Sequence, residues 1–72
     1  MKYAVVIERG PSGFGAYVPD LPGCVAVAAT REEVEHLIEE GMALHVAGMR
    51  EDGLEIPLPQ TQVAVVDVPI EQ

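Results

Sequence analysis

The sequence predicts a two-layer α+β domain in which a single helix covers one face of a β-sheet. Three observations lead to this fold class: three short apolar runs separated by Gly/Pro turns, one amphipathic helical stretch, and a last β-branched run near the C-terminus. The element order is therefore β-β-β-α-β. A right-handed crossover that brings the fourth strand parallel to the first gives the sheet order 3-2-1-4. Seventy-two residues form one domain, residues 1–72.

The first two strands are expected to form a hairpin. Residues 3–8 (YAVVIE) and 14–18 (FGAYV) are short and rich in β-formers. Residues 10–13 (GPSG) between them have the composition of a turn. Because side chains alternate across a strand, Tyr3, Val5 and Ile7 should face one side of the sheet. Glycines in this turn precede a strand and not a helix, so the pattern does not predict a phosphate-binding loop.

Residues 19–34 (PDLPGCVAVAATREEV) hold a turn, a strand and a helix start within sixteen positions. Proline ends the second strand, and residues 24–28 form the third. We interpret Cys24 as a small buried residue at the start of that strand. The turn supplies the candidate partner-contact or turn residues, which are Asp20, Leu21, Pro22 and Gly23.

The helix is expected to begin after Thr30, which forms a capping box with Glu33, and to run to about Arg50. Gly53 is its stop signal. Apolar residues recur at helical spacing and predict a buried stripe. The residues of that stripe are Val34, Leu37, Ile38, Met42 and Met49, with Gly41 and His45 on the same face.

Residues 54–60 (LEIPLPQ) read as an extended connection, and residues 62–68 (QVAVVDV) as the last strand. Val63 and Val65 should face one side of this strand, and Ala64, Val66 and Val68 the other. The sheet face away from the helix would carry small apolar residues from every strand. We therefore expect a homo-oligomer, a dimer or larger, in which the open face or an edge strand packs against a second copy. A hydrophobic content of 49% agrees with this expectation.

The formal net charge is −8, from twelve acidic and four basic residues. Nucleic-acid binding requires Lys and Arg to neutralise phosphates, so direct binding is not expected. An acidic surface fits either simple solvation or a basic protein partner. The few apolar residues after Met1 and Lys2 are too short for a signal peptide or a membrane span, which predicts a cytoplasmic protein. The lack of Asn fits a heat-adapted source, whereas the single Lys does not.

The sequence predicts no catalytic, cofactor or metal site. A two-metal nuclease would need converging carboxylates, for which Glu8, Asp20 and Asp67 are the candidates. Nothing in their spacing brings them together, so they read as acids at strand ends and turns.

Cysteine and histidine chemistry is not predicted either. Cys24 has no histidine near it in sequence to activate its thiol. His36 and His45 are nine residues apart and lack the spacing of a metal site. Both read as core or interface residues.

The first strand KYAVVIE, a glycine-bearing hairpin, the run PDLPGC, the TREE helix start and the later EIPLP together resemble the HicB family of antitoxins. The resemblance covers nearly the whole chain. It implies a partial RNase H-like fold without catalysis and a role in neutralising HicA, a small basic toxin that cleaves mRNA. Many family members add a C-terminal DNA-binding segment. The sequence reaches Gln72 without one, so it is similar to a short form that does not bind operator DNA.

Three functional hypotheses follow. The leading one is an antitoxin-like protein-binding module of a type II toxin–antitoxin system, which masks a HicA-type toxin. The alternative is a stand-alone oligomeric HicB-like domain that binds a small ligand or another protein without a toxin partner. The third is a residual nuclease, which the carboxylate pattern disfavours.

Overall fold

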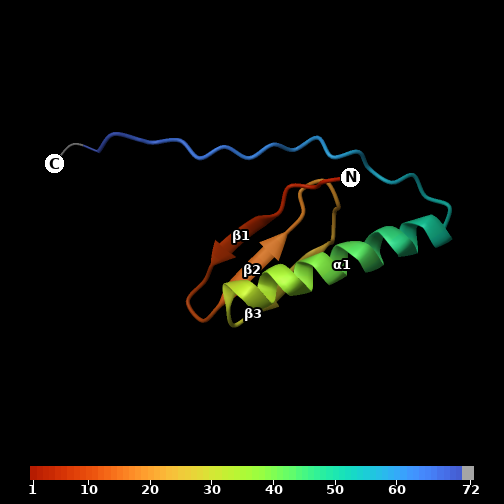
Figure 1. Ribbon diagram of the computed structural model, residues 1–72, viewed down its shortest axis with the longest axis horizontal. Helices are drawn as coiled ribbons and strands as arrows, with labels where there is room; N and C mark the ends of the chain where they lie inside the picture. The colour runs from red at the N-terminus through yellow and green to blue at the C-terminus, as the bar shows by residue number, and fades with distance from the viewer. Residues whose placement is uncertain (71–72) are drawn as a thin grey trace.

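The computed structural model describes residues 1–70 and shows a three-stranded antiparallel sheet with one long helix on it. The sheet order is β1-β2-β3, and the helix α1 packs against β2 and β3 (Figure 1). The bounds of these elements are Val6–Arg9 for β1, Phe14–Tyr17 for β2, Val25–Ala28 for β3 and Arg31–Glu51 for α1. The expected α+β class and the single helix are confirmed.

The hairpin of β1 and β2 sets the alternation of side chains across the sheet. In its register Val6 lies opposite Tyr17, and Tyr17 lies opposite Val25 on β3. These three side chains share the face away from the helix. On the other face, Val5 and Ile7 pack against the buried cluster, as their spacing predicts.

The turn between β1 and β2 depends on close backbone approach at Gly13. The Gly10 amide donates to the Gly13 carbonyl at 2.8 Å and closes the turn. A Cβ atom on Gly13 would lie 2.5 Å from the carbonyl oxygen of Ala28, at the end of β3. A Cβ atom does not come this close to an oxygen atom in real structures, so the hairpin can lie against β3 in this way only with glycine at this position.

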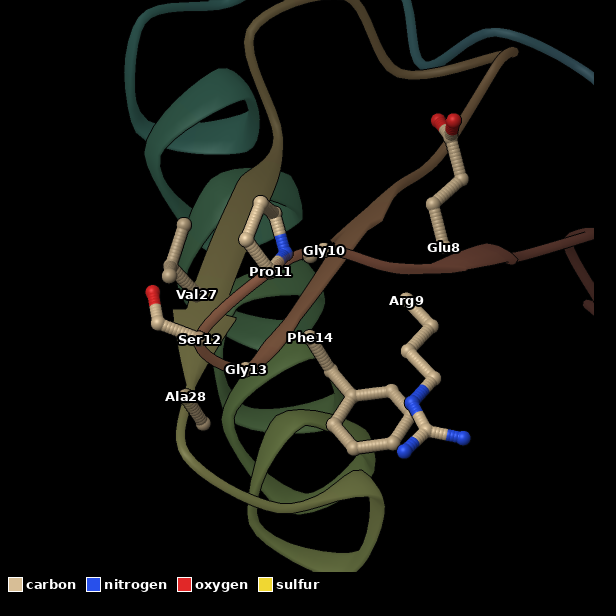
Figure 2. A pocket seen from close by; sticks show the side chains of 10 residues that line it. Glu8, Arg9, Gly10, Pro11, Ser12, Gly13, Phe14, Val27 and Ala28 are labelled. Carbon is tan, nitrogen blue, oxygen red and sulfur yellow. The ribbon is translucent and has the colours of Figure 1, made fainter.

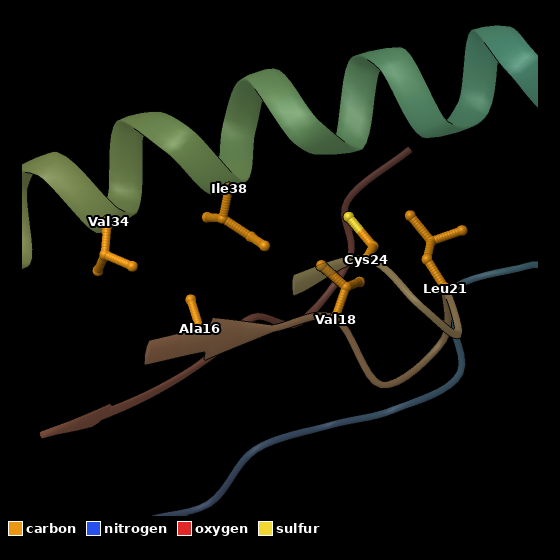
Figure 3. Close-up of a cluster of buried hydrophobic side chains, with 6 residues drawn as sticks. All are labelled: Ala16, Val18, Leu21, Cys24, Val34 and Ile38. Atoms are coloured by element: carbon orange, nitrogen blue, oxygen red, sulfur yellow. The ribbon is translucent and has the colours of Figure 1, made fainter. Parts of the chain in front are cut away.

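The loop between β2 and β3 folds into the core. Val18 donates to the Cys24 carbonyl and Cys24 to the Leu21 carbonyl, so the loop closes on itself. Leu21 points inward and is completely buried, as is Val34 from α1. Figure 3 shows the resulting cluster between the helix and the sheet. Its members are Ala16, Val18, Leu21, Cys24, Val34 and Ile38.

Both ends of α1 are capped by local hydrogen bonds. At the start, the Thr30 side chain accepts from the Glu33 amide at 3.1 Å, as the capping box predicts. The Glu33 carboxylate accepts from the Thr30 hydroxyl instead of its amide. At the end, Gly53 has φ +69° and donates to Arg50, while Leu54 donates to the Met49 carbonyl. This pair of bonds is the Schellman motif, and it stops the helix where glycine predicts.

The expected stripe of α1 is narrower than the sequence suggests. Val34 and Ile38 are buried, and Met42 packs at the edge of the cluster. Leu37 is 42% exposed. It lies on the side of α1 away from β1, since Glu35 and Glu39 are the helix residues beside Val5 and Ile7. Leu44 is also exposed.

The fourth strand expected over residues 62–68 is not formed within the chain. These residues are extended, and no backbone hydrogen bond joins them to β1 among the described residues 1–70. The sheet therefore has three strands in place of the expected order 3-2-1-4. The physical reason is the course of the chain after α1, which runs past the outer side of β1 without entering the ladder (Figure 1).

Gly13→Ala should lower the free energy of unfolding by about 1–3 kcal/mol, because the new methyl group forces the hairpin away from Ala28. Chemical denaturation followed by circular dichroism measures the change. Gly48→Ala is the matched control, since a Cβ there meets nothing within 4 Å. In the interior of α1 it should stabilise by up to about 1 kcal/mol. Equal effects of the two substitutions would contradict the close approach at Gly13.

Candidate functional site

The carboxylate of Asp20 lies on the outer side of the loop between β2 and β3 and holds the segment that follows α1. Its Oδ2 atom accepts from the backbone amides of Gln60 at 3.0 Å and of Thr61 at 2.9 Å. Its Oδ1 atom accepts from the Thr61 hydroxyl at 2.8 Å. These contacts, which we name the Asp20 latch, join residues forty positions apart in the chain.

The latch shifts the titration of Asp20. The Thr61 amide is the main cause, and it holds the pKa of the Asp20 carboxyl below its usual value of 3.8. The Thr61 hydroxyl and the Gln60 amide act in the same direction, against partial desolvation. Donors favour the charged carboxylate over the neutral acid, so the group stays ionised wherever the latch is closed.

A second contact supports the same segment. The hydroxyl of Tyr3 donates to the carbonyl of Pro57. This bond and the Asp20 latch together hold residues 57–61 against the rest of the domain, at Tyr3 before β1 and at Asp20 in the loop after β2. No sequence spacing pairs Tyr3 with Pro57 or Asp20 with Thr61. The residues of these two contacts lie 54 and 41 positions apart in the chain. These are the site contacts that sequence reasoning missed.

The four candidate residues of the turn separate into different roles. Leu21 is a core residue, with no exposed surface. Gly23 has φ +87°, a backbone conformation that favours glycine, and it lets the loop reverse. Pro22 is exposed beside it. Asp20 is engaged with residues 60 and 61, so its expected contact with a partner stays a prediction.

Cys24 lies in the core, and its surroundings make the thiol a poor nucleophile. Its side chain is buried and unpaired with any other cysteine. Burial raises the pKa of the Cys24 thiol, which disfavours the reactive thiolate. An added Cβ at Gly41 of α1 would lie 3.9 Å from the sulfur, so the helix passes close to it. Packing explains this residue.

The remaining titratable side chains do not assemble into a catalytic or metal centre. Residues 1–70 contain no group of three or more His, Cys, Asp and Glu side chains placed to hold a metal ion. His36 contacts Glu40 through its Nε2 atom at 2.9 Å, on the exposed side of α1. Glu8 is exposed on β1, and Asp67 lies on the exposed segment after the latch.

A hollow of about 380 Å³ lies at the hairpin turn. Figure 2 shows that the Glu8 carboxylate and the Arg9 guanidinium at its rim point apart, so they do not converge on a common ligand. The floor is formed by backbone of the turn and by Phe14 and Val27. The hollow is explained by the shape of the hairpin turn, and its lining residues do not form a group of side chains that could hold a phosphate or a metal ion.

The first half of α1 carries a strongly acidic surface. Five exposed glutamates lie within residues 31–40, with Arg31 as the single basic residue among them. They are Glu32, Glu33, Glu35, Glu39 and Glu40. Arg31 is paired with Glu35 at 3.0 Å, which leaves a strong net negative charge on this surface. We call it the acidic half of α1.

Within residues 1–70, α1 is too polar to cross a bilayer, and no other helix is present that is long enough to do so.

The sequence that forms this fold matches one family of bacterial antitoxins. Residues 3–70 match the family model described as "HicB_like antitoxin of bacterial toxin-antitoxin system". The match covers most of the chain, which therefore belongs to the HicB-like antitoxin family. The expected resemblance to HicB is confirmed.

Individual relatives agree with this assignment. The chain is 33% identical over 70 residues to "Antitoxin HicB 2" of Photorhabdus laumondii subsp. laumondii, covering 96% of this chain and 50% of that protein. It is 37% identical over 57 residues to an uncharacterized 14.9 kDa protein of Haemophilus phage HP1, covering 79% of this chain and 43% of the relative. The chain thus spans about half the length of these curated relatives.

A solved structure gives the same fold. A chain of the "HicA3 and HicB3 toxin-antitoxin complex" aligns with a TM-score of 0.70 and 28% identity. The alignment covers 83% of this chain and 70% of that chain.

Asp20→Ala should release residues 60 and 61, because the two backbone amides lose their acceptor. Their hydrogen exchange, measured by NMR, should become faster while the core amides of α1 stay protected. Asp52→Ala is the matched control, since it removes an exposed carboxylate before the same segment. The latch would be contradicted if these two amides exchanged faster in the control, or if their exchange in Asp20→Ala were unchanged.

The latch should also depend on pH. Because the folded pKa of Asp20 is depressed, its stabilisation is complete above the ordinary value of 3.8 and is lost as the pH falls through the lower folded value. The carboxyl carbon shift of Asp20, followed by NMR, should titrate with a midpoint below 3.8. A midpoint at or above that value would show that the carboxylate is not held by these donors.

Proposed function

We propose that the chain is an antitoxin module that neutralises a HicA-type mRNA-cleaving toxin by covering the surface that binds RNA. The family match over residues 3–70 carries this proposal, and the likeness to a chain of the "HicA3 and HicB3 toxin-antitoxin complex" supports it. The protein acts by binding and not by catalysis. Its place of action is the cytoplasm, where mRNA is found.

Charge supports the choice of partner. An RNA-cleaving toxin must present basic side chains to phosphates. The antitoxin carries a net charge of −8, and the acidic half of α1 concentrates five glutamates on one exposed surface. Opposite charges on the two proteins accelerate their encounter and exclude RNA from the same basic surface. The same acidity disfavours nucleic acid as a direct ligand of this chain.

Exposed apolar side chains beside this surface supply contact area. Leu37 and Leu44 are exposed on α1, each four residues after a glutamate, Glu33 and Glu40 respectively. Interfaces place such residues at the centre and charges at the rim. Glu32 and Glu39, which have no salt-bridge partner among the described residues, are free to meet basic groups of the toxin.

The function is tested by searching the reading frames next to its gene for one that encodes a small basic protein, and by co-expressing that protein with this chain. Growth should be arrested by that protein alone and restored when this chain is present, and the two should co-purify. Failure to co-purify together with failure to restore growth would contradict the antitoxin function and favour a stand-alone module.

The surface is tested by Glu32→Gln combined with Glu39→Gln. Loss of two charges at the contact should raise the dissociation constant of the complex about tenfold, mainly through slower association at low salt. Surface plasmon resonance at two salt concentrations measures both rates. The control is Glu51→Gln with Glu55→Gln, which removes the same charge beyond the acidic half. Equal weakening by the two pairs would show that net charge, and not this surface, determines binding.

A further inference from the structure

The outer edge of β1 is open for a further strand. Within residues 1–70, β1 pairs with β2 alone, and its opposite edge has no partner strand. An unpaired edge presents a row of backbone donors and acceptors that favours the addition of another strand. The fold thus has a vacant place beside β1, the place where the sequence predicts a fourth strand.

Residues 62–70, which we call the arm, have the composition of a strand and no partner. Their backbone forms no hydrogen bond with the rest of the described chain. All of its large aliphatic side chains are exposed, and Val65 is 98% exposed. These side chains are Val63, Val65, Val66, Val68 and Ile70. A β-branched, apolar segment in this state leaves its backbone groups to water and its apolar surface uncovered, so strand pairing is favourable for it.

The arm and the edge of β1 match in side chains and charge. One hollow is lined by Val5 and Ile7 on one side and by Val63 and Val65 on the other, so the two segments lie at the same level. A parallel register with Val65 beside Ile7 brings Asp67 beside Arg9. Arg9 is one of only four basic residues in an acidic chain, and in this register the arm places a carboxylate beside it. Local charges therefore favour the pairing although the net charge of −8 repels whole copies.

The chain's own arm leaves this edge without pairing. The Asp20 latch and the bond from Tyr3 to Pro57 fix residues 57–61, and the arm then runs past β1 and projects beyond the sheet (Figure 1). The radius of gyration is 14.7 Å, whereas a compact chain of this length has about 11 Å. An arm that projects in this way is positioned to reach a second molecule.

We propose that the arm forms the fourth strand on the β1 edge of a second copy of this chain, and that the exchange is reciprocal. Each sheet then has the order 3-2-1-4, with a fourth strand from the partner. The two-fold arrangement pairs the β1 edge of both copies at once, as is common when strands are exchanged between protomers. In this register Val63 and Val65 lie on the same face of the partner's sheet as Val5 and Ile7, the face that the helix covers.

The exchanged dimer does not depend on the antitoxin function. It concerns β1 and the arm, whereas the proposed toxin surface lies on the acidic half of α1. Toxin binding and dimer formation are measured separately, so either can fail alone.

The exchange is tested by mixing two full-length variants in a Cys24→Ala background. One copy carries Glu8→Cys on β1, the other Val66→Cys on the arm, and both positions are exposed. The register above places them on neighbouring strands, within the reach of a disulfide. Mild oxidation should give a disulfide-linked pair that contains one copy of each variant, identified by mass spectrometry. A chain carrying both cysteines that closes as a linked monomer, with no mixed pair, would show that the arm folds onto its own sheet and would overturn the proposal.

Proline variants give an independent measurement. Val65→Pro and Val66→Pro are made separately, because neighbouring amides point to opposite sides of a strand and one of them must donate to β1. Light scattering should show a dimer for the parent chain and a monomer for at least one proline variant. Val66→Thr, which keeps the amide and the branched side chain, should remain a dimer. A monomeric parent, or a dimer that neither proline weakens, overturns the exchange.

Discussion

The burial of the loop between β2 and β3 beneath α1 is the interaction on which the rest of the molecule depends. A four-residue strand on each side makes few contacts of its own, and a three-stranded sheet needs a covered face to persist. Leu21 supplies the missing volume by pointing into the space between sheet and helix, beside Cys24 and in the same buried cluster as Val34 and Ile38 (Figure 3). Full burial of one such side chain is worth about 1.5–3 kcal/mol, a large share for a domain of this size.

The same loop connects the core to the segment that follows α1. With Leu21 turned inward, its neighbour Asp20 faces the opposite direction and meets the amides of residues 60 and 61. Core packing therefore fixes the carboxylate, and the carboxylate fixes the point from which the arm departs. The stretch from Pro19 to Cys24 therefore connects β2 to β3 and also fixes the position of residues 60 and 61, forty residues later in the chain.

Local chemistry made much of the fold predictable from the sequence. The capping box at Thr30 and the glycine stop at Gly53 depend on neighbours in the chain, and both are found as expected. The three strands follow from β-branched runs and turns, although each is shorter than its apolar run. The family resemblance likewise rests on contiguous motifs, and it is confirmed.

Long-range contacts account for what the sequence could not predict. A pattern of valines at residues 62–68 indicates a strand but does not name its partner, and within the chain none is formed. Asp20 was recognised as a turn residue, whereas its bonds to Gln60 and Thr61 follow only from the folded path. Leu37 fits a helical stripe, yet it lies on the side of α1 away from β1 and is partly exposed. Each difference arises where the outcome depends on which distant surface is available.

The central claim is that the arm is completed by a second molecule. Hydrogen exchange of the arm amides in the full chain, resolved by NMR and recorded at high and low protein concentration, tests it most directly. The account predicts protection of amides within residues 62–68 that increases with protein concentration, while the core of α1 remains protected throughout. Protection independent of concentration, or none at any concentration, would contradict it.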